Sequence, residues 1–69
     1  MTTLEQLKKK EPHYLASKIG QLNNDLHYHQ RRLRLCRHDD AIKNIVLSIE
    51  KVKFEKNMHE EALTFVKQS

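Results

Sequence analysis

The residues whose types could do chemistry are five histidines and a single cysteine, in a chain of 69 residues. Imidazole and thiolate groups are ligands that zinc prefers, but they must converge on one point. His27 and His29 lie two residues apart, so their rings would diverge on a helix. His29 and Cys36 share a face, yet seven residues separate them by about 10 Å along a helix axis. The sequence therefore predicts no metal site and no cofactor within one chain.

Acid and base chemistry has equally little support. Glu60 and Glu61 are adjacent, so on a helix they diverge and do not face each other across a substrate. Gly20 is the only glycine, and one glycine makes no phosphate-binding loop. We expect no catalytic residues, no small-molecule substrate and no enzymatic activity.

Arginines near the middle of the chain are the best candidates for contact with an anion. Arg31, Arg32, Arg34 and Arg37 stand close together, and the formal net charge is +4. On a helix they spread around the axis, which predicts a collar and not a single stripe. Such a collar binds the phosphates of RNA or DNA, pairs with an acidic protein, or stays solvated. The sequence leaves these three alternatives open.

A helix-turn-helix unit for DNA binding is a second nucleic-acid hypothesis. Ala16 and Gly20 have the spacing of its small residue and its glycine turn, and the weak helix formers that follow would complete the turn. Gln21 stands where such units usually carry an aliphatic residue, which argues against it. Under both nucleic-acid hypotheses together, the candidate contacts are His27, Gln30, Arg31, Arg32, Arg34 and Arg37.

These side chains must be positioned by helices. Apolar or small residues recur alternately four and three apart, which is the a/d seam of a coiled-coil-like helix. The seam consists of Leu15, Ile19, Leu22, Leu26, His29, Leu33 and Cys36. It predicts one helix over about 12–37, which starts at Pro12 and is either continuous or kinked or broken at residues 20–24, where helix formers are weak. His29, as the polar seam residue, is expected to form a hydrogen bond inside the bundle.

A short leading helix is predicted over about 3–10. Thr2 and Glu5 have the spacing of a capping box, and Pro12 ends the segment. Leu4 and Leu7 give this helix one narrow apolar edge. In an antiparallel hairpin, the amino-terminal part of the seam would lie opposite charged residues of the last helix. We therefore expect the edge of the leading helix, or a second chain, to cover that part of the seam.

The last helix, predicted over about 40–67, is apolar on two sides. Its first face carries Ile42, Ile45, Val46, Ile49 and Val52 and is expected to pack on the preceding helix. The opposite side carries Leu47, Phe54, Met58 and Phe65. A chain this short has too little material to cover both sides, so the second side predicts a partner-binding surface.

Together these segments predict an all-α fold, an antiparallel helical hairpin with a short leading helix, forming a single domain over 1–69 and dimerising into a helix bundle. The layout resembles, in size and arrangement alone, small plasmid-encoded helical bundles that bind RNA. A charged fraction of 32% and the lack of an apolar run of about 18 residues predict no membrane segment. One cysteine and no signal-peptide core predict a cytoplasmic protein.

The functional hypothesis is a small interaction or regulatory protein, of the inhibitor or adaptor type. Its partner would be a second copy of itself, another protein, or both. The alternative is a regulator that binds nucleic acid.

Overall fold

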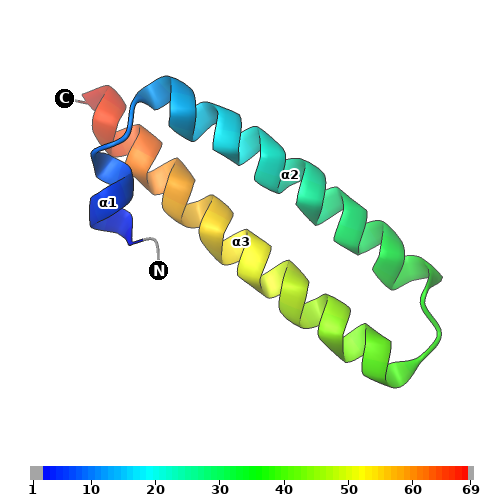
Figure 1. The fold of residues 1–69 in the computed structure, drawn as a ribbon. Coiled ribbons are helices and arrows are strands. Elements are labelled where there is room, and N and C mark those ends of the chain that lie inside the picture. The colour runs from blue at the N-terminus through cyan, green and yellow to red at the C-terminus, as the bar shows by residue number, and fades with distance from the viewer. Residues whose placement is uncertain (1–2, 69) are drawn as a thin grey trace.

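The computed structural model describes residues 3–68, and every regular element among them is a helix. Helix α1 spans Leu4–Lys8, α2 spans Pro12–Leu35 and α3 spans Asp39–Gln68. Helices α2 and α3 run antiparallel as a long hairpin, and α1 lies across its open end beside the last turns of α3 (Figure 1). The predicted all-α hairpin with a short leading helix is confirmed.

Helix α1 has a capping box one residue later than predicted. The backbone N–H of Gln6 donates to the hydroxyl of Thr3 at 3.3 Å, and the N–H of Thr3 donates to the side-chain oxygen of Gln6 at 3.1 Å. The predicted cap, Thr2, lies outside the described residues. Both positions offer a threonine followed three residues later by a glutamate or glutamine, so spacing alone does not choose between them.

Helix α2 runs without interruption through the segment where a break was considered. Pro12 is its first residue, where the missing N–H costs no hydrogen bond, and the helix ends at Leu35, two residues before the predicted end at Arg37. Gly20 lies in the helix interior with ordinary helical geometry. The turn that a helix-turn-helix unit needs is therefore not present at residues 20–24.

The hairpin interface is built from the predicted seam. Leu15 and Leu22 of α2 are buried, as are Ile45 and Ile49 of α3, and the remaining seam residues of α2 are partly buried. Val46 is an exception, because it was assigned to the inner face but is exposed. It follows Ile45 by about 100° around the helix, which carries its side chain past the edge of the interface.

His29 does not satisfy its expected role. It is partly buried in the seam, but its Nδ1 is buried and has no hydrogen-bond partner among the described residues. Its ring and the ring of Tyr28 form an edge-to-face pair, with centroids 5.5 Å apart. The prediction that His29 is hydrogen-bonded within the hairpin is wrong for this nitrogen.

A second core closes the open end of the hairpin. Leu7 of α1, Leu15 of α2 and Ala62 of α3 form one buried cluster. Partly buried apolar side chains surround it, namely Leu4, Met58, Leu63 and Val66. The leading helix thus supplies the covering that the sequence required here, and it does so from the same chain.

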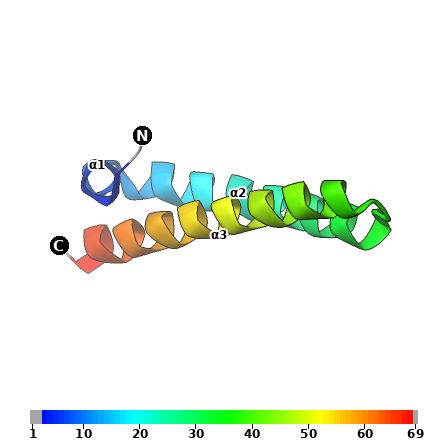
Figure 2. The same cartoon turned by 90° about the horizontal axis from the view of Figure 1, so that it is seen from below.

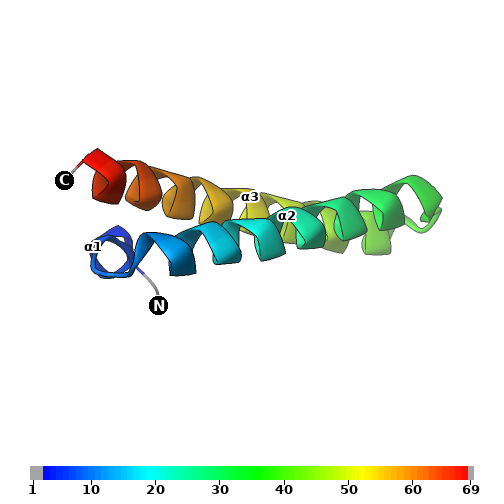
Figure 3. The same ribbon diagram turned by 90° about the horizontal axis from the view of Figure 1, so that it is seen from above.

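The molecule is long and thin. Figures 2 and 3 show α2 and α3 overlapping toward the link between them, whereas at the other end α1 and α2 lie on one level and α3 on another. Its extents are 47 × 19 × 14 Å, and its radius of gyration is 14.2 Å, against about 11 Å for a compact domain of this length. Its accessible surface is 5589 Å², about 1000 Å² more than the roughly 4600 Å² usual for a folded monomer of this mass. A single copy therefore leaves an unusually large area in contact with water.

Candidate interaction surfaces

The side of α3 that faces away from α2 carries a row of apolar side chains, which we call the outer row. It consists of Leu47, Phe54, Met58 and Phe65. Leu47, Phe54 and Phe65 are 57%, 66% and 49% exposed. The members of the row are separated from one another by about whole helical turns, and from Ile45 and Ile49 by about half a turn. The row therefore lies on the side of α3 opposite Ile45 and Ile49. Burying them against a partner would remove apolar area from water at about 25 cal/mol per Å².

Met58 differs from the other three. It is partly buried, and it packs on the cluster of Leu7, Leu15 and Ala62. Phe65 also has a neighbour from α1, since the Lys8 ammonium lies 4.5 Å from the centroid of its ring. The leading helix therefore covers one flank of the row and leaves Leu47, Phe54 and much of Phe65 open.

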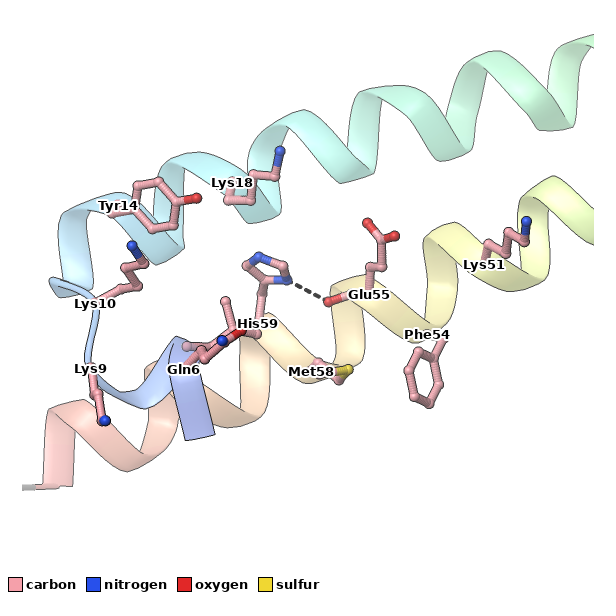
Figure 4. A pocket seen from close by; sticks show the side chains of 11 residues that line it. Gln6, Lys9, Lys10, Tyr14, Lys18, Lys51, Phe54, Glu55, Met58 and His59 are labelled. Atoms are coloured by element: carbon pink, nitrogen blue, oxygen red, sulfur yellow. Dashed lines mark hydrogen bonds between the residues drawn. The ribbon is translucent and has the colours of Figure 1, made fainter. Parts of the chain in front are cut away.

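A basic groove lies between α1, α2 and α3 (Figure 4), and Phe54 and Met58 of the outer row form part of its wall. It has a volume of about 1000 Å³. Its charged and aromatic lining comprises Lys9, Lys10, Lys18, Lys51, Glu55, Tyr14 and Phe54. The Lys10 ammonium lies 5.4 Å from the centroid of the Tyr14 ring. With four lysines against one carboxylate, the lining attracts anionic groups.

His59 forms part of the floor of this groove and is the one buried polar side chain within residues 3–68. Its Nδ1–H donates to the backbone carbonyl of Glu55 at 2.6 Å, which fixes the ring on α3. Its other ring nitrogen points toward α2 (Figure 4). Sequence reasoning missed this site, because the groove exists only once α1 has folded against α3. The run Lys8–Lys10 was the only signal for it.

The arginine candidates lie on two different sides of α2 near the hairpin tip. His27, Arg31 and Arg34 share one stripe because they are four and three residues apart in a continuous helix, and Gln30 borders that stripe. Arg32 points elsewhere, with its guanidinium carbon 5.7 Å from the centroid of the Tyr28 ring. Arg37 lies beyond the helix end. The four arginines therefore point in different directions around the hairpin tip, with Arg31 and Arg34 on one stripe.

The four arginines are open to solvent. Arg31, Arg32, Arg34 and Arg37 are exposed, and none forms an ion pair within residues 3–68, where the ion pairs join Lys8 to Glu5 and Lys56 to Glu60.

Cys36, in the link between α2 and α3, is a free thiol whose Sγ–H donates weakly to the carbonyl of His38 at 3.8 Å.

The described part of the chain lacks the features of two further kinds of site. No three His, Cys, Asp or Glu side chains there are grouped so that they could hold a metal ion. None of its helices combines the length and the apolar character that crossing a membrane requires.

Comparison of the chain with protein-family models, with curated proteins and with solved structures found no match to any of them.

Proposed function

We propose that this protein is a small, non-enzymatic interaction module, of the inhibitor or adaptor type, that associates through the outer row of α3. The observation that carries the proposal is the exposure of Leu47, Phe54 and Phe65 on one side of one helix. Monomeric proteins rarely leave large apolar side chains gathered along an edge in this way, and such patches mark interaction sites.

The shape of the molecule supports the same function. The surface in excess of a compact monomer is about 1000 Å², and a standard interface buries about 800 Å² on each partner. Aromatic residues and methionine are enriched in interface cores, and the outer row contains two phenylalanines and one methionine. An amphipathic helix that presents anchors at such spacings is a common way to dock on another helix or in a groove.

The test replaces Leu47 and Phe54 together by serine. The matched control, Tyr28→Ser with Leu35→Ser, removes two exposed apolar side chains from α2 instead. Association is measured in two ways, by sedimentation of the purified chain and by capture of other proteins on it. We expect the first double variant to keep its helical circular dichroism and lose both kinds of association, and the control to keep them. Unchanged association in the L47S/F54S variant would overturn the proposal.

Nucleic-acid binding by the tip of the hairpin is the second candidate function. The stripe of His27, Arg31 and Arg34 is exposed, and its arginines have no acidic partner within the described residues. Arginines aligned on a helix make bidentate contacts with phosphates. Affinity for a DNA or RNA oligonucleotide should then fall steeply as the salt concentration rises, whereas apolar docking through the outer row should hardly respond.

A further inference from the structure

We propose that the partner of the outer row is a second copy of this chain, bound antiparallel, with the two-fold axis level with position 56 of α3. This inference rests on the proposed function and names the partner for it.

The outer row belongs to a longer and very regular seam. Eight residues of α3, on the side away from α2 or at the edges of that side, are spaced alternately three and four apart, as the a/d positions of a coiled coil are. Lys51 is at one edge and also lines the basic groove. In chain order the seam consists of Asn44, Leu47, Lys51, Phe54, Met58, Glu61, Phe65 and Gln68. Met58 is partly buried, and the other seven are exposed. We call this set the outer seam.

The outer seam is complementary to its own reverse. In an antiparallel pair centred on position 56, residues equally far from that position on either side face each other across the axis. Phe54 then faces Met58 of the second copy, and Leu47 faces Phe65 of the second copy. Both contacts are apolar, and an aromatic ring beside a methionine sulfur is a favourable contact.

The polar positions of the seam match in the same register. Lys51 faces Glu61 of the second copy, and the two-fold symmetry forms this ion pair twice. Neither residue has an ion-pair partner within residues 3–68 of one copy. At the ends of the seam, Asn44 faces Gln68 of the second copy, so an amide meets an amide. Every layer thus joins side chains of matching chemistry.

Other arrangements of the same two helices lose this match. A parallel pair in register places Lys51 against Lys51 and Glu61 against Glu61. An antiparallel pair shifted by one heptad in either direction places Lys51 against Phe54, or Glu61 against Met58. Like charges or a charge against an apolar side chain are unfavourable, so the charges specify a single orientation and register.

The resulting dimer has the two α3 helices at its centre and the two α2 helices outside, because the exposed apolar residues of the seam lie on the side of α3 opposite the buried Ile45 and Ile49. Helix α1 borders the seam at Phe65 and partly covers Met58, and it leaves Leu47, Phe54 and much of Phe65 exposed. A standard interface buries about 800 Å² on each partner, which is less than the roughly 1000 Å² by which the surface of a single copy exceeds that of a compact monomer.

Charge exchange tests the register. The full-length chain should sediment as a dimer, and Lys51→Glu or Glu61→Lys alone should raise the dimer Kd about tenfold, because each puts two pairs of like charges in the seam. The double variant K51E/E61K restores both pairs and should restore the Kd. A wild-type chain that stays monomeric at about 0.1 mM, or single variants that associate as well as the wild type, would overturn the inference.

Cysteine cross-linking tests the orientation independently, in a Cys36→Ser background that removes the native thiol. When chains carrying Lys51→Cys are mixed with chains carrying Glu61→Cys, a disulfide should form between position 51 of one chain and position 61 of the other. Chains carrying Lys51→Cys alone should not cross-link to each other, because the two copies of position 51 lie about 15 Å apart along the axis. Disulfides joining position 51 to position 51 would show a parallel dimer and contradict the inference.

The two proposals fail separately. A monomeric chain that still captures another protein, and loses it in the L47S/F54S variant, removes the second copy as the partner and leaves the interaction module standing. Equal association of the L47S/F54S variant and the wild type removes both.

Discussion

Leu15 in α2 and Ala62 in α3 are both completely buried, with no surface accessible to water, and they share one cluster with Leu7 of α1. The three helices therefore meet at a single point near the open end of the hairpin. A small residue at position 62 lets α1 and α2 approach α3 together, because alanine occupies little space between two leucines. This cluster is where the fold depends most on individual side chains.

Leu7→Ala should accordingly destabilise the protein by about 2–5 kcal/mol, through lost burial and the cavity that remains. That is a large share of the roughly 3–10 kcal/mol expected for a domain of 69 residues. Urea unfolding followed by circular dichroism measures the change. Leu35→Ala is the control, because Leu35 is 76% exposed and its loss should change stability by no more than about 0.5 kcal/mol. Equal effects of the two substitutions would contradict the role given to the cluster.

Gly20→Ala should stabilise α2 by about 0.5–1 kcal/mol. Gly20 is exposed in the helix interior, and a Cβ atom built there would meet nothing within 4 Å. The substitution therefore gains helix propensity without a steric cost. A thermal melt should show an increase of several degrees in Tm. A decrease would mean that the backbone at position 20 needs a freedom that the continuous helix does not show.

His29→Leu should raise stability by about 1 kcal/mol. The buried Nδ1 of His29 has no hydrogen-bond partner among the described residues, and its seam neighbours Leu26 and Leu33 are apolar. Removing an unsatisfied buried nitrogen ends its desolvation cost, and leucine continues the apolar seam. Urea unfolding with His27→Leu as the control separates this effect from general hydrophobicity, since His27 is exposed. A loss of stability in H29L would show that the imidazole is satisfied in solution.

Arg31→Ala and Arg34→Ala should each weaken binding of an oligonucleotide and lower the slope of log K against log salt by about 1, if each arginine contacts one phosphate. Arg32→Ala is the matched control, because Arg32 lies off the stripe and over Tyr28. Fluorescence anisotropy at several salt concentrations measures both quantities. Equal effects of all three substitutions would favour the collar that the sequence suggested over the stripe.

Periodicity was enough to predict the hairpin. The alternating four and three spacing from Leu15 to Cys36 determined which side of α2 is buried, and Pro12 marked its start. Boundaries were less accurate, because Thr2 and Thr3 offer equivalent caps and spacing does not distinguish them. Val46 was assigned to the interface wrongly, since a helical wheel gives the direction of a side chain but not the width of the contact.

The candidate surfaces were predictable to different degrees. The outer row followed from the sequence, because side chains opposite a packed face of a long helix are exposed unless another segment covers them. The partial burial of Met58 did not follow, because it depends on where α1 comes to rest. The same is true of the basic groove and of His59, whose surroundings come from all three helices.

The hairpin is held at both ends, by the three-residue link 36–38 at one and by α1 at the other. Both chain termini lie at the α1 end (Figure 1). A tag or fusion partner attached before α1 would consequently lie close to the cluster of Leu7, Leu15 and Ala62 and to the basic groove that Leu7 also lines. Cys36, in the opposite end, offers a thiol for dyes or spin labels at a distance from this cluster.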